Sequence, residues 1–450
     1  MEYLDILRRY GLFDVKVPRY TSYPPANRFE AAIGKRNQIQ WLDKIPGERP
    51  VSIYIHIPFC KRLCWFCACR TQGTKTQAPL EAYVQAVKRE FEAVSQILGQ
   101  IPPMERLHLG GGTPTILSMP QMRSLLNTVF SCFPIAKNFE FSVEIDPTEA
   151  SDEVLLELQQ WGLNRASIGV QDFNPRVQKA IGRSQSFQQT QKVLDQVRHQ
   201  GVSNVNFDLL YGLPFQTQKT LFKTIDMVAL LNPDRIALYG YAHVPHASKR
   251  QVMINVDELP SPEARYLMAK NASQKFDLLG YQKVGIDHFA KPSDSLIKAA
   301  QHRRLRRNFQ GYTDDNCETL IGFGASAISK FPEGFSQNAV STAAYVARVT
   351  AEGTAGHKGY RMQGTDAVIA RMIEMLMTDF AIDESAIETH LADNQDVKAY
   401  FELIFNKFSD VLEQENGRIS VKPGFEELVR VISSSLDIKN IDNAHHSLAI

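Results

Sequence analysis

The chain has 450 residues, of which 44% are hydrophobic, and its 50 lysines and arginines nearly balance its 49 aspartates and glutamates. This length predicts one large domain with a smaller one, and a net charge of +1 gives no reason to expect a nucleic acid or a membrane surface as partner. No apolar run approaches the roughly 18 residues of a membrane-spanning helix. The opening MEYLDILRRYGLFD has no signal-peptide pattern, so we expect a cytoplasmic protein.

The first strand signal in the chain is VSIYIHIP, residues 51–58, where β-branched and aromatic residues follow a period of two. Directly after it, CKRLCWFCAC places Cys60, Cys64, Cys67 and Cys69 within ten residues. Thiols stay reduced in the cytoplasm, so a group this dense indicates metal binding or redox chemistry before it indicates disulfides.

Zinc and an iron–sulfur cluster are the two main candidates for these thiols, with a plain thiol-rich core loop as a third. Structural zinc usually takes two separated cysteine pairs, and Cys67 and Cys69 flank a single residue, which is awkward for one small ion. A CxxxCxxC loop can wrap three corners of a cubane, which favours Cys60, Cys64 and Cys67 as iron ligands. The fourth iron would then keep the open position typical of a catalytic site. Cys69 would lie near the cluster without binding it, or would be a small buried residue.

Further strand signals recur down the chain, and amphipathic helices separate most of them. The expected strands lie in ERLHLGGGTP, FEFSVEIDP, RASIGVQDF, VNFDLLYGLP and RIALYGYAHVP, and the helices in LEAYVQAVKREFEAVSQIL, DEVLLELQQWG, FQQTQKVLDQVRHQG and TLFKTIDMVALLN. This alternation predicts about six βα units around a parallel sheet, and therefore a complete or partial βα barrel. IGFGASAIS is a candidate extra strand.

Polar residues and glycines stand at the C-terminal ends of these strands, namely Glu144, Gln171, Asp208 and the turn from Gly110 to Thr113. Barrel active sites are built on that rim, so their recurrence there favours a site. Taken singly, each has an ordinary explanation in backbone hydrogen bonding or a tight turn. The glycine run lacks the GK[ST] of a phosphate loop and the GxGxxG pattern, but bare backbone can approach a small amino-acid-like ligand closely.

The last third of the chain carries weaker signals. Residues 331–365 are predicted to be loop and connector. IARMIEMLMTDF and FEELVRVISSSL are expected helices, and NGRISV is an expected tight turn into a strand. Helices with a hairpin predict a small winged-helix-like domain.

These motifs together carry a resemblance. A CxxxCxxC loop after the first strand of a βα barrel, followed by GGGTPT, resembles the radical S-adenosylmethionine (SAM) superfamily. A larger set resembles, within it, the oxygen-independent coproporphyrinogen III oxidase family: PRYTSYPPA, YIHIPFCKRLCWFCAC, SVEIDP, SIGVQDF, DLLYGLP, YGYAHVP, GIDHFAKP, RNFQGYTDD and IGFGASAIS. This match runs almost continuously from residue 18 to residue 330. The fourth cysteine and the PRYTSYP segment separate this family from its haem-chaperone and haem-degrading relatives.

The resemblance implies an α/β fold in three parts. Residues 1–48 would form an N-terminal arm over the active site, and residues 49–330 a partial (β/α)6-type, TIM-like barrel. Residues 331–450 would contain the connector and a small α+β, winged-helix-like C-terminal domain.

The resemblance also implies a [4Fe–4S] cluster held by Cys60, Cys64 and Cys67, and two SAM molecules. The first SAM, on the cluster, would contact Tyr54, Gly111, Glu144 and Ile328. The second SAM would contact Phe66, Gly112, Thr113, Gln171, Arg183, Asp208 and Ala242.

His56 and Cys69 are the candidate catalytic residues beyond these contacts. His56 shares a strand face with Tyr54, which predicts that it points inward, although a hydrogen-bonded core histidine is the alternative.

The implied reaction removes a hydrogen atom from two substrate propionates by means of a 5′-deoxyadenosyl radical. Loss of CO2 and one electron from each leaves vinyl groups, turning coproporphyrinogen III into protoporphyrinogen IX for haem biosynthesis. The partners would be this substrate, a low-potential electron donor and an electron acceptor, and we expect a monomer. The alternatives are a radical SAM paralogue acting on another tetrapyrrole or haem, a haem chaperone or carrier that keeps the cluster, and a plain electron carrier.

A substrate with four carboxylates needs local positive charge in a nearly neutral protein. HRRLRRNFQGY, residues 302–312, is the densest basic run, which makes Arg303, Arg304, Arg306 and Arg307 candidate propionate partners. The ordinary alternative is a solvated helix face.

Overall fold

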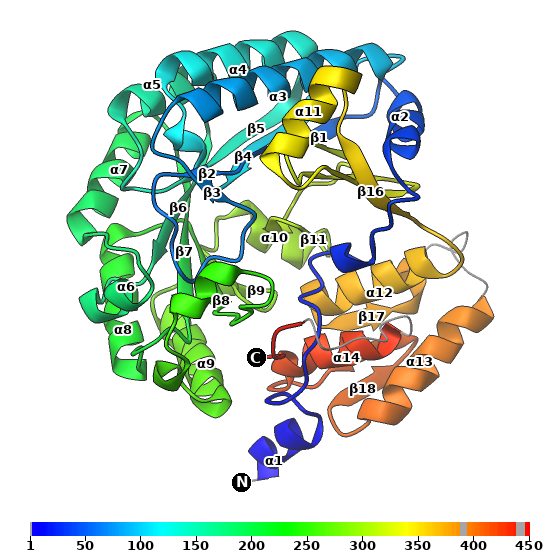
Figure 1. Cartoon of the computed structure of the whole chain (residues 1–450). Helices are drawn as coiled ribbons and strands as arrows, with labels where there is room; N and C mark the ends of the chain where they lie inside the picture. The colour runs from blue at the N-terminus through cyan, green and yellow to red at the C-terminus, as the bar shows by residue number, and fades with distance from the viewer. Residues whose placement is uncertain (1, 388–393, 438–445) are drawn as a thin grey trace.

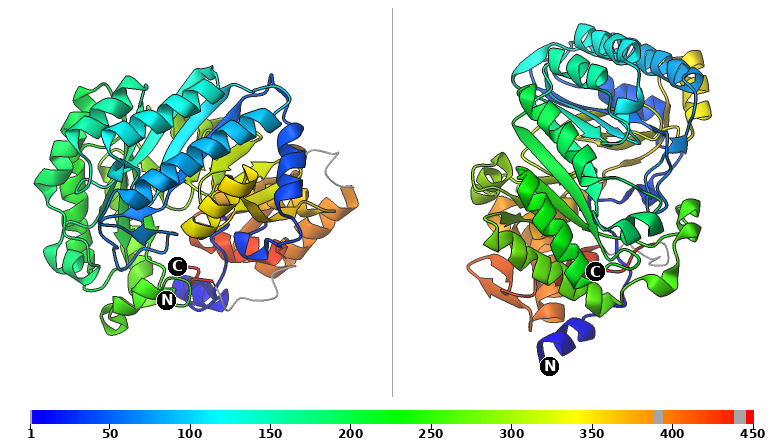
Figure 2. Two further views of the ribbon diagram at one scale, coloured as in Figure 1. Left: turned by 45° about the horizontal axis from the view of Figure 1, so that its top comes forward. Right: turned by 90° about the vertical axis from the view of Figure 1, so that its left-hand side faces the viewer.

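The computed structural model describes residues 2–387, 394–437 and 446–450. One large curved sheet with helices on its outside forms the main body, and the C-terminal helices lie beside the two ends of that sheet (Figure 1). Two further views show the same outer layer of helices around the strands (Figure 2). In the described part of the chain, no helix is both long and apolar enough to cross a membrane.

The middle of the twelve-stranded sheet is parallel, as the alternation of strands and helices predicted. In spatial order its strands are β13 (Leu320–Phe323), β1 (Val51–Ile57), β4 (Met104–Gly111), β5 (Ile135–Ile145), β6 (Arg165–Gln171), β7 (Asn204–Tyr211) and β8 (Arg235–Gly240). β13 is the extra strand expected from IGFGASAIS. The sheet ends in separate edge strands instead of closing on itself, which confirms a partial barrel.

The connecting helices cover the outer face of these strands. They are α3 (Ala78–Ile97), α4 (Met119–Cys132), α5 (Asp152–Gln160), α6 (Pro175–Ala180), α7 (Phe187–His199), α8 (Gln218–Leu231) and α9 (Pro262–Leu278), whereas α10 (Ser295–Gln301) places Leu296 in the lining of an interior cavity. Helix α7 is typical: its Ser186 and Gln189 form a capping box, and Val193 and Val197 are buried toward the sheet. Strand burial alternates along β6, so one face packs in the core and the other lines the barrel interior.

Antiparallel strands extend the sheet at both ends. β10 (His288–Ala290) and β9 (Gln282–Val284) follow β8. Beyond β13 come β14 (Ile328–Phe331), β15 (Gly334–Asn338) and, after α11 (Thr342–Glu352), β16 (Gly356–Arg361).

The prediction of loop and connector over 331–365 is therefore wrong. β15 reads GFSQN and carries no alternating apolar pattern, because it buries polar residues, of which Asn338 bonds to distant partners. Asn338 donates to Glu90 of α3 over 2.7 Å, for example. We propose that the barrel unit extends through β16 and that the C-terminal domain begins after it.

The C-terminal domain packs helices on a three-stranded antiparallel sheet of order β17-β19-β18, in keeping with the expected winged-helix-like unit. Its elements are α12 (Asp366–Asp379), β17 (Ala381–Asp383), α13 (Asn394–Phe408), β18 (Leu412–Glu415), β19 (Arg418–Val421) and α14 (Val429–Leu436).

The N-terminal arm contributes to both units. α1 (Glu2–Arg9) and the residues after it place Leu7 and Phe13 in the same core as Ile432 of α14. α2 (Lys35–Asp43) instead packs against the barrel core. In Figure 1 the arm, drawn in dark blue, runs past the C-terminal helices between these two contacts.

Candidate active site

The cysteine loop begins directly after β1 and is closed by its own short strands. β2 (Phe59–Cys60) pairs with β3 (Gln72–Gly73), so both ends of the loop are fixed beside the barrel. The buried carboxylate of Glu149 accepts from the backbone N–H groups of Lys61 (3.2 Å) and Arg62 (3.1 Å). The β2–β3 pairing and the hydrogen bonds to Glu149 thus both hold the cysteine loop in place.

All four cysteines of the loop line one cavity of about 410 Å³. Thr113 Oγ1 lies 3.7 Å from Cys60 Sγ, and Arg183 Nη1 lies 3.6 Å from Cys64 Sγ, so both sulfurs have a donor beside them. Burial raises the pKa of the Cys60 thiol to about 12, whereas a hydrogen bond from the Cys69 thiol lowers the pKa of Cys67.

This donor set suits thiolate ligands of a metal cluster, since a guanidinium beside a sulfur favours its charged form. Within the described ranges, however, no three His, Cys, Asp or Glu side chains are arranged to hold a metal ion as they stand. Ligation by Cys60, Cys64 and Cys67 stays a prediction.

The glycine turn after β4 lies directly against the cysteine loop. Gly112 N–H donates to Ile57 O (2.8 Å) and Thr113 N–H donates to Phe59 O (2.9 Å). A Cβ on Gly112 would stand 2.5 Å from Phe59 O, so no other residue fits this approach. Since both N–H groups already have acceptors, they are not free for the amino-acid-like ligand that the sequence suggested.

Glu144, at the end of β5, presents a carboxylate to the cavity. Its Oε2 accepts from Gly111 N–H (3.0 Å) and its Oε1 lies 3.4 Å from His108 Nε2. Burial raises the pKa of Glu144, but the hydrogen bonds from His108 and Gly111 outweigh it and leave the pKa below its ordinary value. This residue is therefore an anion at the cavity wall.

Asp208 of β7 lies in a different environment. It accepts from Ser167 Oγ (2.8 Å) and Asn206 Nδ2 (2.9 Å), and burial raises its pKa. The two carboxylates of the rim thus differ in how readily they give up a proton.

Ion pairs occupy the opposite, N-terminal end of the barrel interior. Glu140 binds Arg106 (2.7 Å) and Arg165 (2.8 Å), and Arg106 also reaches Asp314 (3.1 Å). These long side chains fill the lower interior, so the open space lies toward the C-terminal ends of the strands, where the cysteines are.

Arg183 is held by several protein groups. Its guanidinium lies 2.9 Å from Asp146, donates to Gly169 O (2.8 Å) and Gln185 Oε1 (3.1 Å), and faces Cys64. This set of bonds braces the cysteine loop against β6.

His56 is bonded through both ring nitrogens. Nε2 lies 3.0 Å from the carbonyl oxygen of Arg70 and must carry the proton, so Nδ1 accepts from the Tyr54 hydroxyl (2.9 Å). Burial lowers the pKa of His56 and keeps this tautomer neutral. The geometry favours the hydrogen-bonded alternative for His56, because it links β1 to the cysteine loop.

Known proteins resemble this chain over its whole length. The model of the radical SAM superfamily matches residues 54–228. An oxygen-independent coproporphyrinogen III oxidase of Paracoccus denitrificans is 44% identical over 451 residues, which cover 100% of each chain. The Escherichia coli protein of that name is 36% identical over 403 residues, with 88% of each chain covered. The chain belongs to the oxygen-independent coproporphyrinogen III oxidase family.

A solved structure agrees with this assignment. The coproporphyrinogen III oxidase of Escherichia coli, described as a radical SAM enzyme, has a TM-score of 0.89 and 34% identity, with 94% of this chain and 97% of that chain covered. This coproporphyrinogen III oxidase family member is therefore a radical SAM oxidoreductase, and its superfamily implies a [4Fe–4S] cluster and SAM.

Most of the residues singled out from the sequence of this oxidase meet at one cavity. Its lining includes Cys60, Cys64, Phe66, Cys67, Cys69, Gly111, Gly112, Thr113, Glu144, Gln171, Arg183 and Asp208. Tyr54, His56 and Ile328 are outside that lining, and Ala242 faces a neighbouring cavity. Their roles stay predictions.

The sequence reasoning missed inward-facing residues further down the strands of the oxidase. His108, Ser142, Ser167 and Asn206 all line the cavity. His108, Ser142 and Asn206 stand two residues before Gly110, Glu144 and Asp208. Ser167 stands four residues before Gln171, so continuing the period-two pattern inward from the rim would have found them all.

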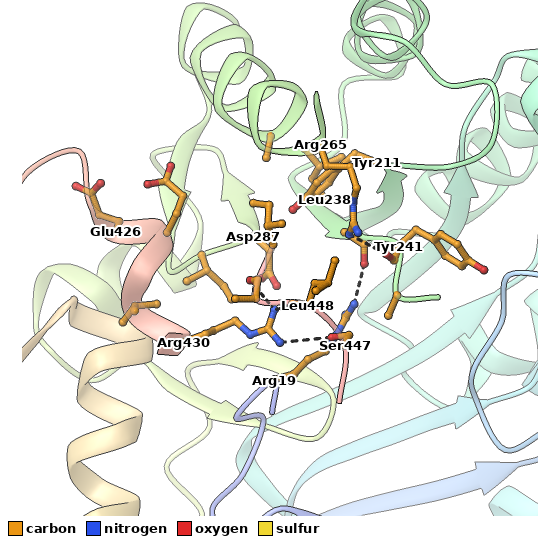
Figure 3. Close-up of a pocket in the computed structure, with 18 of the residues that line it drawn as sticks. Arg19, Tyr211, Leu238, Tyr241, Arg265, Asp287, Glu426, Arg430, Ser447 and Leu448 are labelled. Carbon is orange, nitrogen blue, oxygen red and sulfur yellow. Dashed lines mark hydrogen bonds between the residues drawn. The ribbon is translucent and has the colours of Figure 1, made fainter. Parts of the chain in front are cut away.

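The neighbouring cavity is larger, about 770 Å³, and the oxidase builds it from three parts of the chain. The arm contributes Arg19, the end of β8 contributes Gly240 and Tyr241, and the C-terminal domain contributes Arg430 (Figure 3). No motif in the sequence predicted this cavity, because its residues come from segments far apart.

Proposed function

We propose that this chain catalyses the oxygen-independent oxidative decarboxylation of two propionates of coproporphyrinogen III to vinyl groups, giving protoporphyrinogen IX in haem biosynthesis. Family membership over the full length supports the reaction. The observation that carries the proposal is the cavity in which the four cysteines of one loop face the polar rim of the barrel.

Cys60, Cys64 and Cys67 are the proposed ligands of the [4Fe–4S] cluster. When bound, the cluster and SAM supply the 5′-deoxyadenosyl radical that removes a hydrogen atom from the propionate. Arg183 and Thr113 place donors beside Cys64 and Cys60, which supports thiolate ligation there. In this proposal Cys69 lies beside Cys67, takes part in catalysis and does not bind the metal.

The proposal includes two SAM molecules. Glu144 suits the ammonium or ribose hydroxyls of the first SAM, because it is ionised and faces the cavity. Asp208 and Gln171 suit the second, since both line the same space from β7 and β6. His56 would position Tyr54 and the cysteine loop.

The reaction also requires a low-potential electron donor and an electron acceptor. We propose that a monomer in the cytoplasm carries it out. One chain supplies the barrel residues that line both cavities, as well as the arm and the C-terminal domain that line the larger one, and reduced thiols suit that compartment.

The test uses protein purified without oxygen and supplied with iron, sulfide, SAM, a strong reductant and coproporphyrinogen III. We expect fluorescent protoporphyrin after oxidation of the product, with Cys64→Ala abolishing it. Cys132→Ala, which removes a thiol of α4 outside the loop, should retain it. SAM cleavage without protoporphyrin would indicate a paralogue with another substrate. Stoichiometric haem binding without SAM cleavage would indicate a carrier.

A further inference from the structure

Four arginines from four separate segments line the larger cavity. They are Arg19 of the arm, Arg265 of α9, Arg307 of β11 (Arg306–Asn308) and Arg430 of α14. Figure 3 shows Arg19, Arg265 and Arg430 extending into the same space. Such a concentration of positive charge in a protein of net charge +1 requires an explanation.

Arg307 is the most deeply buried of the guanidinium groups that lack full pairing. Its side chain is 5% exposed and lies 3.9 Å from Asp287, while its Nε and Nη1 have no hydrogen-bond partner among the described residues. Asp287 is shared, since it also lies 2.7 Å from His288 Nδ1. The face of Arg307 rests on the Tyr312 ring, 4.4 Å away, which fixes its plane. Two buried donors without acceptors are costly unless a ligand supplies an oxygen.

Arg19 and Arg265 are anchored side by side on the end of β8. Arg19 donates to Gly240 O (2.7 Å) and Arg265 donates to Tyr241 O (2.8 Å). Both acceptors are neutral, so neither charge is compensated there. The Nε of Arg265 also has no partner within the described ranges. Each guanidinium therefore keeps donors for a ligand.

Arg430 differs from the other three arginines because its guanidinium binds backbone carbonyls of the arm and the chain end. It donates to Val17 O and Ala449 O, both over 2.8 Å, and also to Pro18 and Leu448 carbonyls. Its hydrogen bonds hold the arm and the chain end together, while its charge stays in the cavity. Burial, with further contributions from Arg19 and Arg307, lowers the pKa of Arg430 to about 9.

Among the acidic residues of the same cavity, Asp287 faces the arginines, but one shared carboxylate does not neutralise four guanidinium groups. Figure 3 shows Glu426 on the far side from Arg19 and Arg265. Glu427 is influenced by Lys283 and Lys270 instead, both of which also line the cavity. The arginines thus form a distinct basic wall.

The basic cavity and the cysteine cavity share a wall. Gly240, Asp287 and Arg307 line the larger space, and the residues next to them in the chain, Tyr239, His288 and Asn308, line the cysteine cavity. A volume of about 770 Å³ is in the ~300–1,000 Å³ range of small-molecule sites.

We propose that this cavity holds the tetrapyrrole and that Arg19, Arg265 and Arg307 bind the carboxylates of propionates that are not reacting. A propionate on the other side of the ring would then face the shared wall, which has the cysteine cavity on its other side. Guanidinium groups suit this task because they bind carboxylates through two parallel hydrogen bonds. The inference rests on the proposed function for the identity of the ligand.

The structure corrects the prediction that the basic run 302–312 supplies the propionate partners, since only one of its four candidate arginines lines the cavity. Arg303 pairs with Asp383 (3.1 Å), Arg306 pairs with Glu374 (2.8 Å), and Arg304 is exposed. Of that run, Arg307 alone is in the lining of the cavity.

The experiment compares wild type with Arg19→Gln, Arg265→Gln, Arg265→Lys and Arg307→Gln, and uses Arg304→Gln as the control from the same basic run. Binding of coproporphyrin III, the stable oxidised form, and of its tetramethyl ester is followed by fluorescence. The KM for coproporphyrinogen III, binding of SAM and thermal unfolding are measured on the same preparations. Arg19 is exposed in the arm, so its variant tests the proposal even if a buried variant folds poorly.

We expect each Gln variant to weaken coproporphyrin binding and raise KM by roughly 10- to 100-fold, as for loss of a charge-assisted hydrogen bond. Arg265→Lys should recover part of the loss, SAM binding should stay unchanged, and Arg304→Gln should behave as wild type. The tetramethyl ester should bind weakly and equally to all of them.

Two results would overturn the inference: equal binding of coproporphyrin by wild type and the arginine variants, or equal binding of acid and ester by wild type. Failure of the proposed function has a separate signature, namely wild type that makes no protoporphyrinogen. If that enzyme still binds the tetracarboxylate through these arginines, the carboxylate site stands and the reaction assignment falls.

Discussion

Gly112 sets how closely the glycine turn can approach the cysteine loop. Its N–H bonds to Ile57 O, and the nearest atom to an added Cβ would be the backbone oxygen of Phe59 at 2.5 Å. Backbone cannot move aside as a flexible side chain can, so the loop itself would have to shift.

We therefore expect Gly112→Ala to destabilise the protein by roughly 1–3 kcal/mol and to reduce the iron bound per chain. Gly99→Ala is the matched control, because nothing lies within 4 Å of its added Cβ. Thermal unfolding and iron content after anaerobic reconstitution measure the two effects. Normal iron content in Gly112→Ala would show that the turn does not fix the loop.

Residues at fixed offsets from strand ends were predictable from the sequence. The cysteines follow β1, Glu144 and Asp208 stand in the second halves of β5 and β7, and the cavity brings them together. Arg265 and Arg430 were not predictable, because nothing in their own helices marks them. Their importance comes from charges on other elements that only the folded chain brings near.

Elements with a strong apolar period also matched their predictions. The strands and helices of the barrel have buried apolar faces, whereas β15 has a buried polar face whose partners lie on α3 and in other strands. Glu90 of α3 is the centre of this polar group. It accepts from Gly324 N–H (2.9 Å), Asn338 Nδ2 (2.7 Å) and the Tyr345 hydroxyl (2.7 Å), so it ties α3 to β15 and α11.

Burial raises the pKa of Glu90 from 4.5 to about 7. Since the folded pKa is the higher one, the stability from protonated Glu90 is present at low pH and is lost as the pH rises through about 7. Between pH 6 and 8 we expect wild type to lose about 1.4 kcal/mol relative to Glu90→Gln, which cannot ionise. Melting temperatures across this range test it.

Glu92→Gln provides the control for Glu90, since Glu92 lies on the same helix and is exposed. It should keep the pH dependence of wild type. An identical pH slope in Glu90→Gln and wild type would mean that Glu90 does not titrate in this range.

At the scale of the whole molecule, the arm joins the C-terminal domain through a buried ion pair. Arg28 lies 2.5 Å from Asp437, whose side chain is 0% exposed. Removing one member of a buried pair leaves the other charge uncompensated, so we expect Asp437→Asn to cost about 3 kcal/mol. Trypsin should then cut the arm faster, as peptide mapping would show.

The exposed pair Arg9–Asp410 is the matched comparison for this ion pair. Its side chains are 60% and 46% exposed, so Asp410→Asn should change stability by less than about 1 kcal/mol. If trypsin cuts the arm at the same rate in Asp437→Asn and Asp410→Asn, apolar packing alone holds the arm on the C-terminal domain.

The shared core of the arm and the C-terminal domain also fixes an order of events in synthesis. Leu7 and Phe13 pack with Ile373 and Ile432, which the ribosome adds only after the entire barrel. The barrel and its cysteine loop can therefore fold before the residues that pack against the arm have been synthesised. During that interval the larger cavity lacks the walls that the arm and the C-terminal domain give it, so the space proposed for the tetrapyrrole is the last part of the enzyme to be completed.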